Sequence, residues 1–235
     1  MSYDIPANVL ALPITEADMR QTPKSVIVNG VVMFNLGNPY IDAETVTIHF
    51  PGFGFNPQSF AAVKIRMTRS MALVFSSSRA VCPGGRRISD SRLGALRITS
   101  LLLEANIPAW YNNFTVQNLV ANCWAPFEIE LADIHEEYSI STEYKTDKFP
   151  GLAFRMNQPS IIFNIFVTGR VIITGSKDYD HTCKCWWWLY THVLVRHRRG
   201  TAARSTSSAA YKVGALRSPT PPGSRACGPW ICRLL

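Results

Sequence analysis

The feature that most constrains the fold of this chain is an internal repeat. The segment VFSSSRAVCPGGR at residues 74–86 aligns with IFVTGRVIITGSK at residues 165–177, at an offset of 91 residues. Further upstream, two pairs align at an offset of 89: Phe60 with Phe149, and Asn29 with Asn118. An offset that changes once by two residues is typical of a duplication followed by one short deletion. The chain therefore holds two unequal copies of one structural unit.

Each copy has the pattern of strands followed by one helix. An apolar strand surrounds each asparagine, and later strands begin near the first phenylalanine of each copy. The offset changes between Met67 and Leu73, where a hairpin turn would tolerate a difference in length. In the first copy a helix is expected over residues 89–106, with Ser89 or Asp90 as its N-cap and Asn106-Ile107-Pro108 as its end.

The helix of the first copy is expected to place four leucines on one side: Leu93, Leu96, Leu101 and Leu103. Residues 178–194 of the second copy are a poorer helix on propensity, because Trp, Thr and Cys favour helices weakly. The order of elements predicts an α+β fold, an antiparallel sheet with helices on one face. The strands are apolar on both faces, so the second face would expose phenylalanines unless it has a partner.

Charge is concentrated at one end of the chain. The formal net charge is +8. Residues 196–235 hold eight Lys and Arg and no acid, whereas the preceding 195 residues hold 16 basic and 16 acidic residues. The high pI therefore belongs to the tail and does not by itself argue for nucleic acid. The predicted organisation is a tail over 1–24, a first repeat over 25–110, a second repeat over 111–195 and a basic, disordered tail over 196–235.

The sequence gives little indication of a secreted protein, a membrane protein, a metalloprotein or an enzyme. The start of the chain has no pattern of a signal peptide, and no stretch is long enough for a membrane span. None of the six cysteines forms a Cys-x-x-Cys pair, so we expect no metal and no cofactor; Cys183 and Cys185 beside His181 are a weak alternative. The histidines lack the spacing of a catalytic site, so we expect neither an enzyme nor a small-molecule substrate.

Several motifs together resemble the TATA-binding protein family over about residues 24–190. They are FNPQSFAAV, ALVFSSSRAV, FTVQNLV, KFPGLAFRM and IFVTGRVIITGSK. The resemblance implies a saddle, a curved sheet whose concave side lies in the minor groove of promoter DNA and whose convex side carries the helices. This family is the standard example of minor-groove wedging and kinking. It implies a nuclear general transcription factor that works with other general transcription factors and polymerase-associated factors.

The resemblance also implies roles for individual residues. Four phenylalanines would wedge between base steps: Phe60, Phe75, Phe149 and Phe166. Eight residues would contact the bases: Asn29, Val31, Leu73, Val81, Asn118, Val120, Ile172 and Thr174. The two asparagines among them would donate hydrogen bonds to minor-groove acceptors. Phosphate contacts would fall on six basic residues: Arg66, Arg79, Arg86, Arg155, Arg170 and Lys177. Partner contacts would fall on the first helix and on a loop of the second repeat: Arg92, Arg97, Glu143, Lys145, Asp147 and Lys148.

The chain also departs from the pattern of the family. Pro83 stands opposite Thr174 in the alignment of the repeats, Asn164 stands opposite Leu73, and Ser160 takes the place of a basic residue. Fewer phosphate contacts weaken binding and flatten its salt dependence. The alternative function is therefore a related platform or repressor with weakened sequence-specific DNA binding that acts mainly through protein partners.

Overall fold

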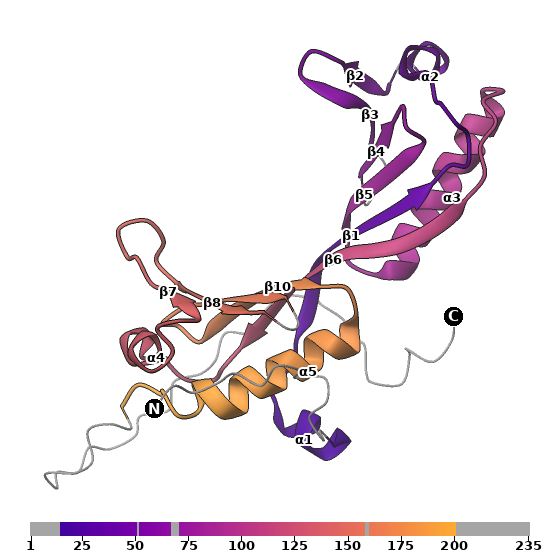
Figure 1. The fold of residues 1–235 in the computed structure, drawn as a ribbon. Helices are drawn as coiled ribbons and strands as arrows, with labels where there is room; N and C mark the ends of the chain where they lie inside the picture. The colour runs from indigo at the N-terminus through magenta and orange to yellow at the C-terminus, as the bar shows by residue number, and fades with distance from the viewer. Residues whose placement is uncertain (1–14, 51, 67–70, 158–159, 201–235) are drawn as a thin grey trace, which may run out of the picture. The chain divides into compact units, whose positions relative to one another are not determined.

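The structure is a computed structural model that describes residues 15–50, 52–66, 71–157 and 160–200, all of one compact unit. The described strands form one antiparallel sheet in the order β2-β3-β4-β5-β1-β6-β10-β9-β8-β7 (Figure 1). The first repeat supplies β1 (Val26–Asn35), β2 (Gly54–Asn56), β3 (Phe60–Arg66), β4 (Met71–Phe75) and β5 (Arg79–Gly85). The second supplies β6 (Asn112–Trp124), β7 (Thr142–Glu143), β8 (Leu152–Met156), β9 (Ile161–Ile165) and β10 (Arg170–Ser176). Read outward from the central β1–β6 pair, both halves have the same strand order.

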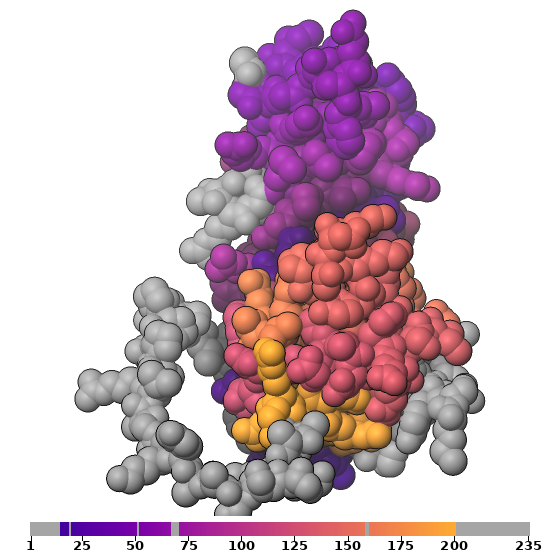
Figure 2. Space-filling model, turned by 90° about the vertical axis from the view of Figure 1, so that its left-hand side faces the viewer, coloured from indigo at the N-terminus to yellow at the C-terminus, as the bar shows by residue number. Residues whose placement is uncertain are grey.

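The two repeats meet by antiparallel pairing of equivalent strands. Three consecutive pairs of β1 and β6 mark the centre: Asn29 with Val120, Gly30 with Leu119, and Val31 with Asn118. Since Asn29 is equivalent to Asn118 and Val31 to Val120, the pairing has a local twofold axis through the Gly30–Leu119 pair. The strands of both repeats therefore belong to one sheet, and Figure 2 shows the first repeat in indigo to purple and the second in red to orange.

The two hairpins confirm where the repeat offset changes. Arg66 of β3 lies opposite Met71 of β4, and the equivalent Arg155 of β8 lies opposite Ile162 of β9. The registers match, so the connection in the second repeat is two residues longer. Residues 67–70 and 158–159 of these connections lie outside the described part of the chain.

Each repeat has a core between its half of the sheet and one long helix. In the first repeat α3 (Ile88–Glu104) packs on β1 and β5, and in the second α5 (Tyr179–Leu189) packs on β6 and β10 (Figure 1). Phe34 and Leu102 are buried in the first core, and Phe154, Phe163 and Trp186 in the second. The predicted fold class, α+β with a curved antiparallel sheet and helices on one face, is confirmed.

The buried side of α3 is not the one predicted. The helix buries Ser91, Ala95, Ile98, Thr99 and Leu102, whereas three of the four predicted leucines are exposed: Leu93, Leu96 and Leu103. Residues 91, 95, 98 and 102 form a stripe at helical spacing, and its small members let the helix approach the sheet closely. A Cβ placed on Gly85 of β5 would clash with the Ser91 hydroxyl oxygen.

The ends of α3 also differ in part from the prediction. The helix begins after Arg87, whose side chain makes no cap, and Asp90 forms an ion pair with Arg87 at 3.0 Å instead of capping. The predicted end is confirmed. Asn106 has a φ of +55°, and the Ile107 N–H donates to the Leu102 carbonyl at 2.9 Å, a Schellman arrangement that satisfies the last carbonyls.

The segment with poor helix propensity in the second repeat is helical, because its apolar side is buried. Asp178 caps α5 by accepting from the His181 N–H at 2.9 Å. Trp186 is buried and its indole N–H donates to the Pro23 carbonyl of the N-terminal segment. A π-helical turn over Tyr190–Leu194 extends α5. Tertiary packing therefore outweighs intrinsic propensity here.

The sequence analysis missed three short helices: α1 (Glu16–Gln21), α2 (Ala43–His49) and α4 (Leu131–Glu137). The first lies within the segment assigned to the N-terminal tail, where it contacts α5. No helix among the described residues is long and apolar enough to cross a membrane.

The first residues assigned to the basic tail pack against the second repeat. The imidazole of His197 lies 2.9 Å from the Glu137 carboxylate, and Arg196 lies 3.2 Å from the same group. The backbone carbonyl of His197 accepts from the Glu130 N–H at 2.9 Å. Arg199 forms ion pairs with acids that precede α4. Residues 201–235, which hold the rest of the predicted tail, lie outside the described residues.

Two neighbouring leucines test the orientation of α3. Leu102 is 0% exposed and Leu103 is 52% exposed. We expect Leu102→Ala to lower the free energy of unfolding by about 2–5 kcal/mol, and Leu103→Ala to change it by less than about 0.5 kcal/mol. Urea unfolding of both variants measures the difference. Equal losses would contradict the orientation of the helix.

Candidate nucleic-acid interface

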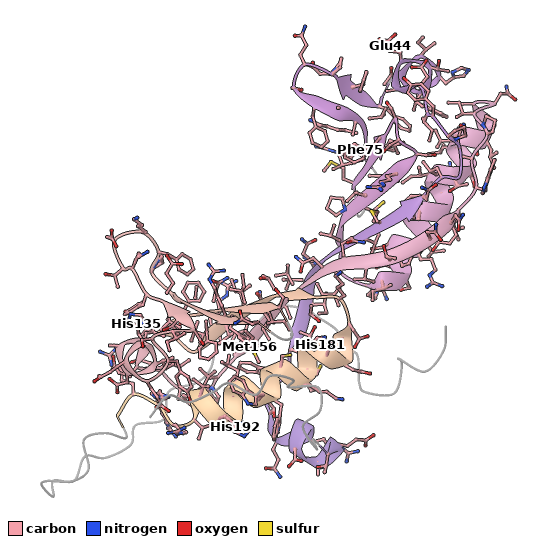
Figure 3. The ribbon with its side chains drawn as sticks, viewed as in Figure 1. Glu44, Phe75, His135, Met156, His181 and His192 are labelled. Atoms are coloured by element: carbon pink, nitrogen blue, oxygen red, sulfur yellow. The ribbon has the colours of Figure 1, made fainter. Side chains whose placement is uncertain are left out.

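The helices leave one face of the sheet uncovered, and we call it the open face. It consists of alternate strand residues, and Figure 3 shows one of them, Phe75, on the side of the sheet away from α3. The structure brings all eight predicted base-contacting residues to this face, where each is half-exposed: Asn29, Val31, Leu73, Val81, Asn118, Val120, Ile172 and Thr174. Their neighbours along each strand, such as Ala80, Ala121 and Ile173, point into the cores.

The two central asparagines are held in the same way. The Asn29 side-chain oxygen accepts from the Gly84 N–H at 2.9 Å, and the Asn118 oxygen accepts from the Gly175 N–H at 2.8 Å. Both glycines have positive φ, +98° and +101°, a conformation that other residues rarely adopt. Because each amide oxygen is engaged, each Nδ2 group keeps its two hydrogens for a ligand on the open face.

Two phenylalanine pairs lie at equivalent positions of the halves. The Phe60 and Phe75 ring centroids are 5.9 Å apart, and those of Phe149 and Phe166 are 5.6 Å apart, with an interplanar angle of 63° in both pairs. Phe60 is 39% exposed and Phe149 is 38% exposed. Phe60 begins β3 as predicted, whereas Phe149 precedes β8 and Phe166 follows β9, so both lie in loops at the ends of strands.

The six predicted phosphate-contacting residues are exposed at strand positions or strand ends: Arg66, Arg79, Arg86, Arg155, Arg170 and Lys177. Their environments differ. Arg155 lies 3.5 Å from the Glu143 carboxylate, whereas the guanidinium of Arg170 stacks over the Trp124 ring at 5.4 Å. No carboxylate among the described residues forms an ion pair with Arg79 or Arg170.

Sequence reasoning missed two exposed residues beside this face. Trp124 is 53% exposed and lies opposite Arg170 in the β6–β10 pairing. Lys64 of β3 lies over the Phe60 ring at 5.4 Å. The repeat comparison contains the signal for both, because Trp124 is equivalent to Asn35 and Lys64 to Ala153. Each is therefore present in one copy only.

The predicted partner residues lie in two separate regions. On α3, Arg92 stacks over Phe114 at 5.1 Å and Arg97 pairs with Glu104 at 3.8 Å. In the second repeat, Lys145 lies 3.0 Å from Glu143. The remaining two are exposed in the loop between β7 and β8: Asp147 and Lys148.

Glu143 is the acidic centre of this loop region. The hydrogen bond and charge of Lys145, followed by those of Arg155, lower the pKa of Glu143. The same residues, with Lys148, Phe149, Gly151 and Ala153, line a hollow of about 210 Å³. Glu143 therefore remains ionised and offsets part of the positive charge beside Phe149.

The alternative metal site finds no geometric support. Among the described residues, no group of three His, Cys, Asp or Glu side chains is arranged to hold a metal ion. Burial raises the pKa of the Cys185 thiol to about 12, and it also raises the pKa of Cys183.

Known proteins share this sequence and fold. A model of the family described as "Transcription factor TFIID (or TATA-binding protein, TBP)" matches residues 113–193. The chain is 35% identical over 182 residues to the TATA-box-binding protein of Caenorhabditis elegans, covering 75% of this chain and 53% of that protein. It therefore spans about half the length of that relative.

Other relatives are covered more fully. The TATA-box-binding protein of Dictyostelium discoideum is 31% identical, with 73% of this chain and 85% of that protein covered. The solved structure of Methanococcus jannaschii TBP superimposes with a TM-score of 0.64 at 29% identity, covering 69% of this chain and 94% of that one. These matches, together with the repeat and the open face, show that the chain belongs to the TATA-binding protein family.

Proposed function

We propose that this chain is a nuclear general transcription initiation factor. In this proposal the open face binds A·T-rich promoter DNA in the minor groove and the phenylalanine pairs wedge between base steps. The DNA bends as a result, and the bent complex nucleates assembly with other general transcription factors and polymerase-associated factors. Family membership supports the coarser part of this proposal, a transcription factor that binds DNA.

The observation that carries the proposal is the pair of equal phenylalanine arrangements. A Phe side chain gains about 1.5–3 kcal/mol by leaving water, so repeated exposure of such rings on one face indicates a partner surface. Phe60 and Phe149 are exposed to nearly the same extent, 39% and 38%. A flat apolar ring can replace the stacking that a kinked base step loses, and two sites at equivalent positions of the repeats suit a duplex kinked twice.

The central asparagines support recognition of A·T pairs. In the minor groove both A·T orientations present only acceptors, adenine N3 and thymine O2. The Nδ2 groups of Asn29 and Asn118 are suitable donors, because Gly84 and Gly175 already occupy the amide oxygens. Val31 and Val120 lie opposite these asparagines in the strand pairing and offer no acceptor to a guanine amino group.

The alternative is a platform or repressor of the same fold that acts through protein partners. The ion pairs of Glu143 with Lys145 and Arg155 favour it, since they offset positive charge that a phosphate would otherwise meet. A mobility shift with A·T-rich and G·C-rich duplexes at moderate salt distinguishes the two functions. A preference for the A·T-rich duplex supports the initiation factor, and equal weak binding supports the platform.

Removing one phenylalanine pair tests the wedges. We expect Phe149→Ala with Phe166→Ala to abolish most of the bend, measured by energy transfer between dyes at the duplex ends. The melting temperature should change little, because these rings lie outside the core. Phe154→Ala is the matched control: Phe154 is fully buried, and its loss should cost about 3–5 kcal/mol of stability. A double variant that melts far below the wild type would show that the rings are core residues.

A single atom of the central amide tests base recognition. Asn118→Asp keeps an oxygen for the Gly175 N–H but replaces the donor with a charged acceptor. We expect at least about a 10-fold loss of affinity for an A·T-rich duplex, because the second aspartate oxygen would face adenine N3 or thymine O2, which are also acceptors. Asn106→Asp, at the end of α3, carries the same charge change outside the open face. Equal affinities of the two variants in a titration would refute the amide's role.

Salt dependence tests the basic residues. We expect Arg79→Ala to reduce the slope of log affinity against log salt by about 1, because one phosphate contact is lost. Arg97→Ala, on the helix side, should leave the slope unchanged. The prediction fails if both substitutions lower the slope equally.

A further inference from the structure

The two halves of the open face differ in chemistry at equivalent positions. In the first repeat, Val81 of β5 lies opposite Met33 of β1 on one side and Leu73 of β4 on the other. Residues directly opposite each other in antiparallel strands share a face, so these three form one row across the open face. The row is apolar throughout.

The equivalent row of the second repeat carries two amides. Ile172 of β10 lies opposite Asn122 of β6 and Asn164 of β9. Asn122 is equivalent to Met33, and Asn164 to Leu73. Two residues further along β10, Thr174 stands at the position equivalent to Pro83 and carries a hydroxyl where Pro83 has an apolar ring. Polar side chains thus replace apolar ones at three equivalent positions of one half.

These two amides are available to a ligand, unlike those at the centre. Asn122 and Asn164 are half-exposed, and among the described residues neither side chain has a hydrogen-bond partner. An asparagine amide both donates and accepts, and a free one can turn either atom outward. By contrast, the Asn29 and Asn118 oxygens each already accept a hydrogen bond from a glycine N–H, which fixes the orientation of these amides.

The difference matters for one base-pair feature. In the minor groove a G·C pair adds the guanine N2 amino group, a donor that A·T pairs lack. Against the Met33–Val81–Leu73 row this donor would lose water and find no acceptor, which is costly. Against Asn122 or Asn164 the same donor would meet an amide oxygen.

We propose that the second-repeat half of the open face accepts a G·C pair and the first-repeat half rejects it. The chain would then bind an asymmetric promoter site in one direction, with the G·C-containing half under the second repeat. This inference rests on the proposed function, since it assumes minor-groove binding by the open face.

A dyad-symmetric A·T duplex provides the test. A G·C pair is placed at each position of one half in turn, and then at the two symmetry-related positions together. With one pair we expect a loss of affinity of at most about 2-fold, because the protein can still bind in one of its two orientations. With G·C at both symmetry-related positions, where the duplex contacts these two rows of side chains, we expect a loss of affinity of about 10-fold or more.

Inosine separates the amino group from the stiffness of the duplex. An I·C pair lacks the N2 amino group, so substituting I·C for G·C should restore most of the affinity lost with two pairs. A loss that persists with I·C would overturn the proposal, because the guanine amino group would not be its cause.

Exchange of residues between the halves gives matched variants. In the variant Asn122→Met with Asn164→Leu, we expect a single G·C pair to lower the affinity about 10-fold. In the variant Leu73→Asn with Met33→Asn, two G·C pairs should lower the affinity only a few-fold. Melting temperatures close to that of the wild type confirm that the half-exposed substitutions leave the fold intact.

The outcomes separate this inference from the proposed function. Preference for A·T with equal losses for the first and second G·C pair overturns the inference and leaves minor-groove binding intact. The same holds if the exchanged variants behave like the wild type. Absence of any preference for the A·T duplex over G·C-rich DNA overturns both.

Discussion

The open face depends on the antiparallel pairing of β1 with β6. This pairing joins two copies of one strand around the Gly30–Leu119 pair, and it alone makes the two half-sheets one continuous sheet. Gly30 is suited to this position because a Cβ there would lie 2.9 Å from the Gly85 carbonyl oxygen. The pairing places Asn29 and Asn118 next to the local axis. The phenylalanine pairs consequently lie at equivalent positions in the two halves.

The same arrangement explains why one face stays uncovered. Each repeat has a single long helix, and α3 and α5 bury the core side of their own half-sheets. The opposite face keeps half-exposed apolar and amide side chains without a covering element among the described residues. Positive φ at Gly84 and Gly175 directs their N–H groups to the central amides, which orients the amide donors outward. The strand pairing and the glycine conformation therefore together determine how Asn29 and Asn118 are presented on the open face.

Much of the fold could be predicted from the repeat, whereas the residues of the candidate interface were predicted from the resemblance to the TATA-binding protein family. The repeat supported that prediction, because a duplicated sheet places equivalent residues such as Phe60 and Phe149, or Asn29 and Asn118, symmetrically. The buried side of α3 could not be predicted in this way, since leucine count favoured Leu93 and Leu103 over small residues such as Ser91 and Ala95. The close approach of Ser91 to Gly85 in the structure explains why small side chains occupy the buried side of the helix. Likewise, the packing of Trp186 against Pro23 joins distant segments that no local pattern connects.

The central claim is that the open face contacts the minor groove, and methylation protection tests it directly. Dimethyl sulfate modifies adenine at N3 in the minor groove and guanine at N7 in the major groove. The account predicts that the chain protects adenine N3 within an A·T-rich site and leaves guanine N7 in and beside that site reactive. Protection of guanine N7 with reactive adenine N3 would contradict it.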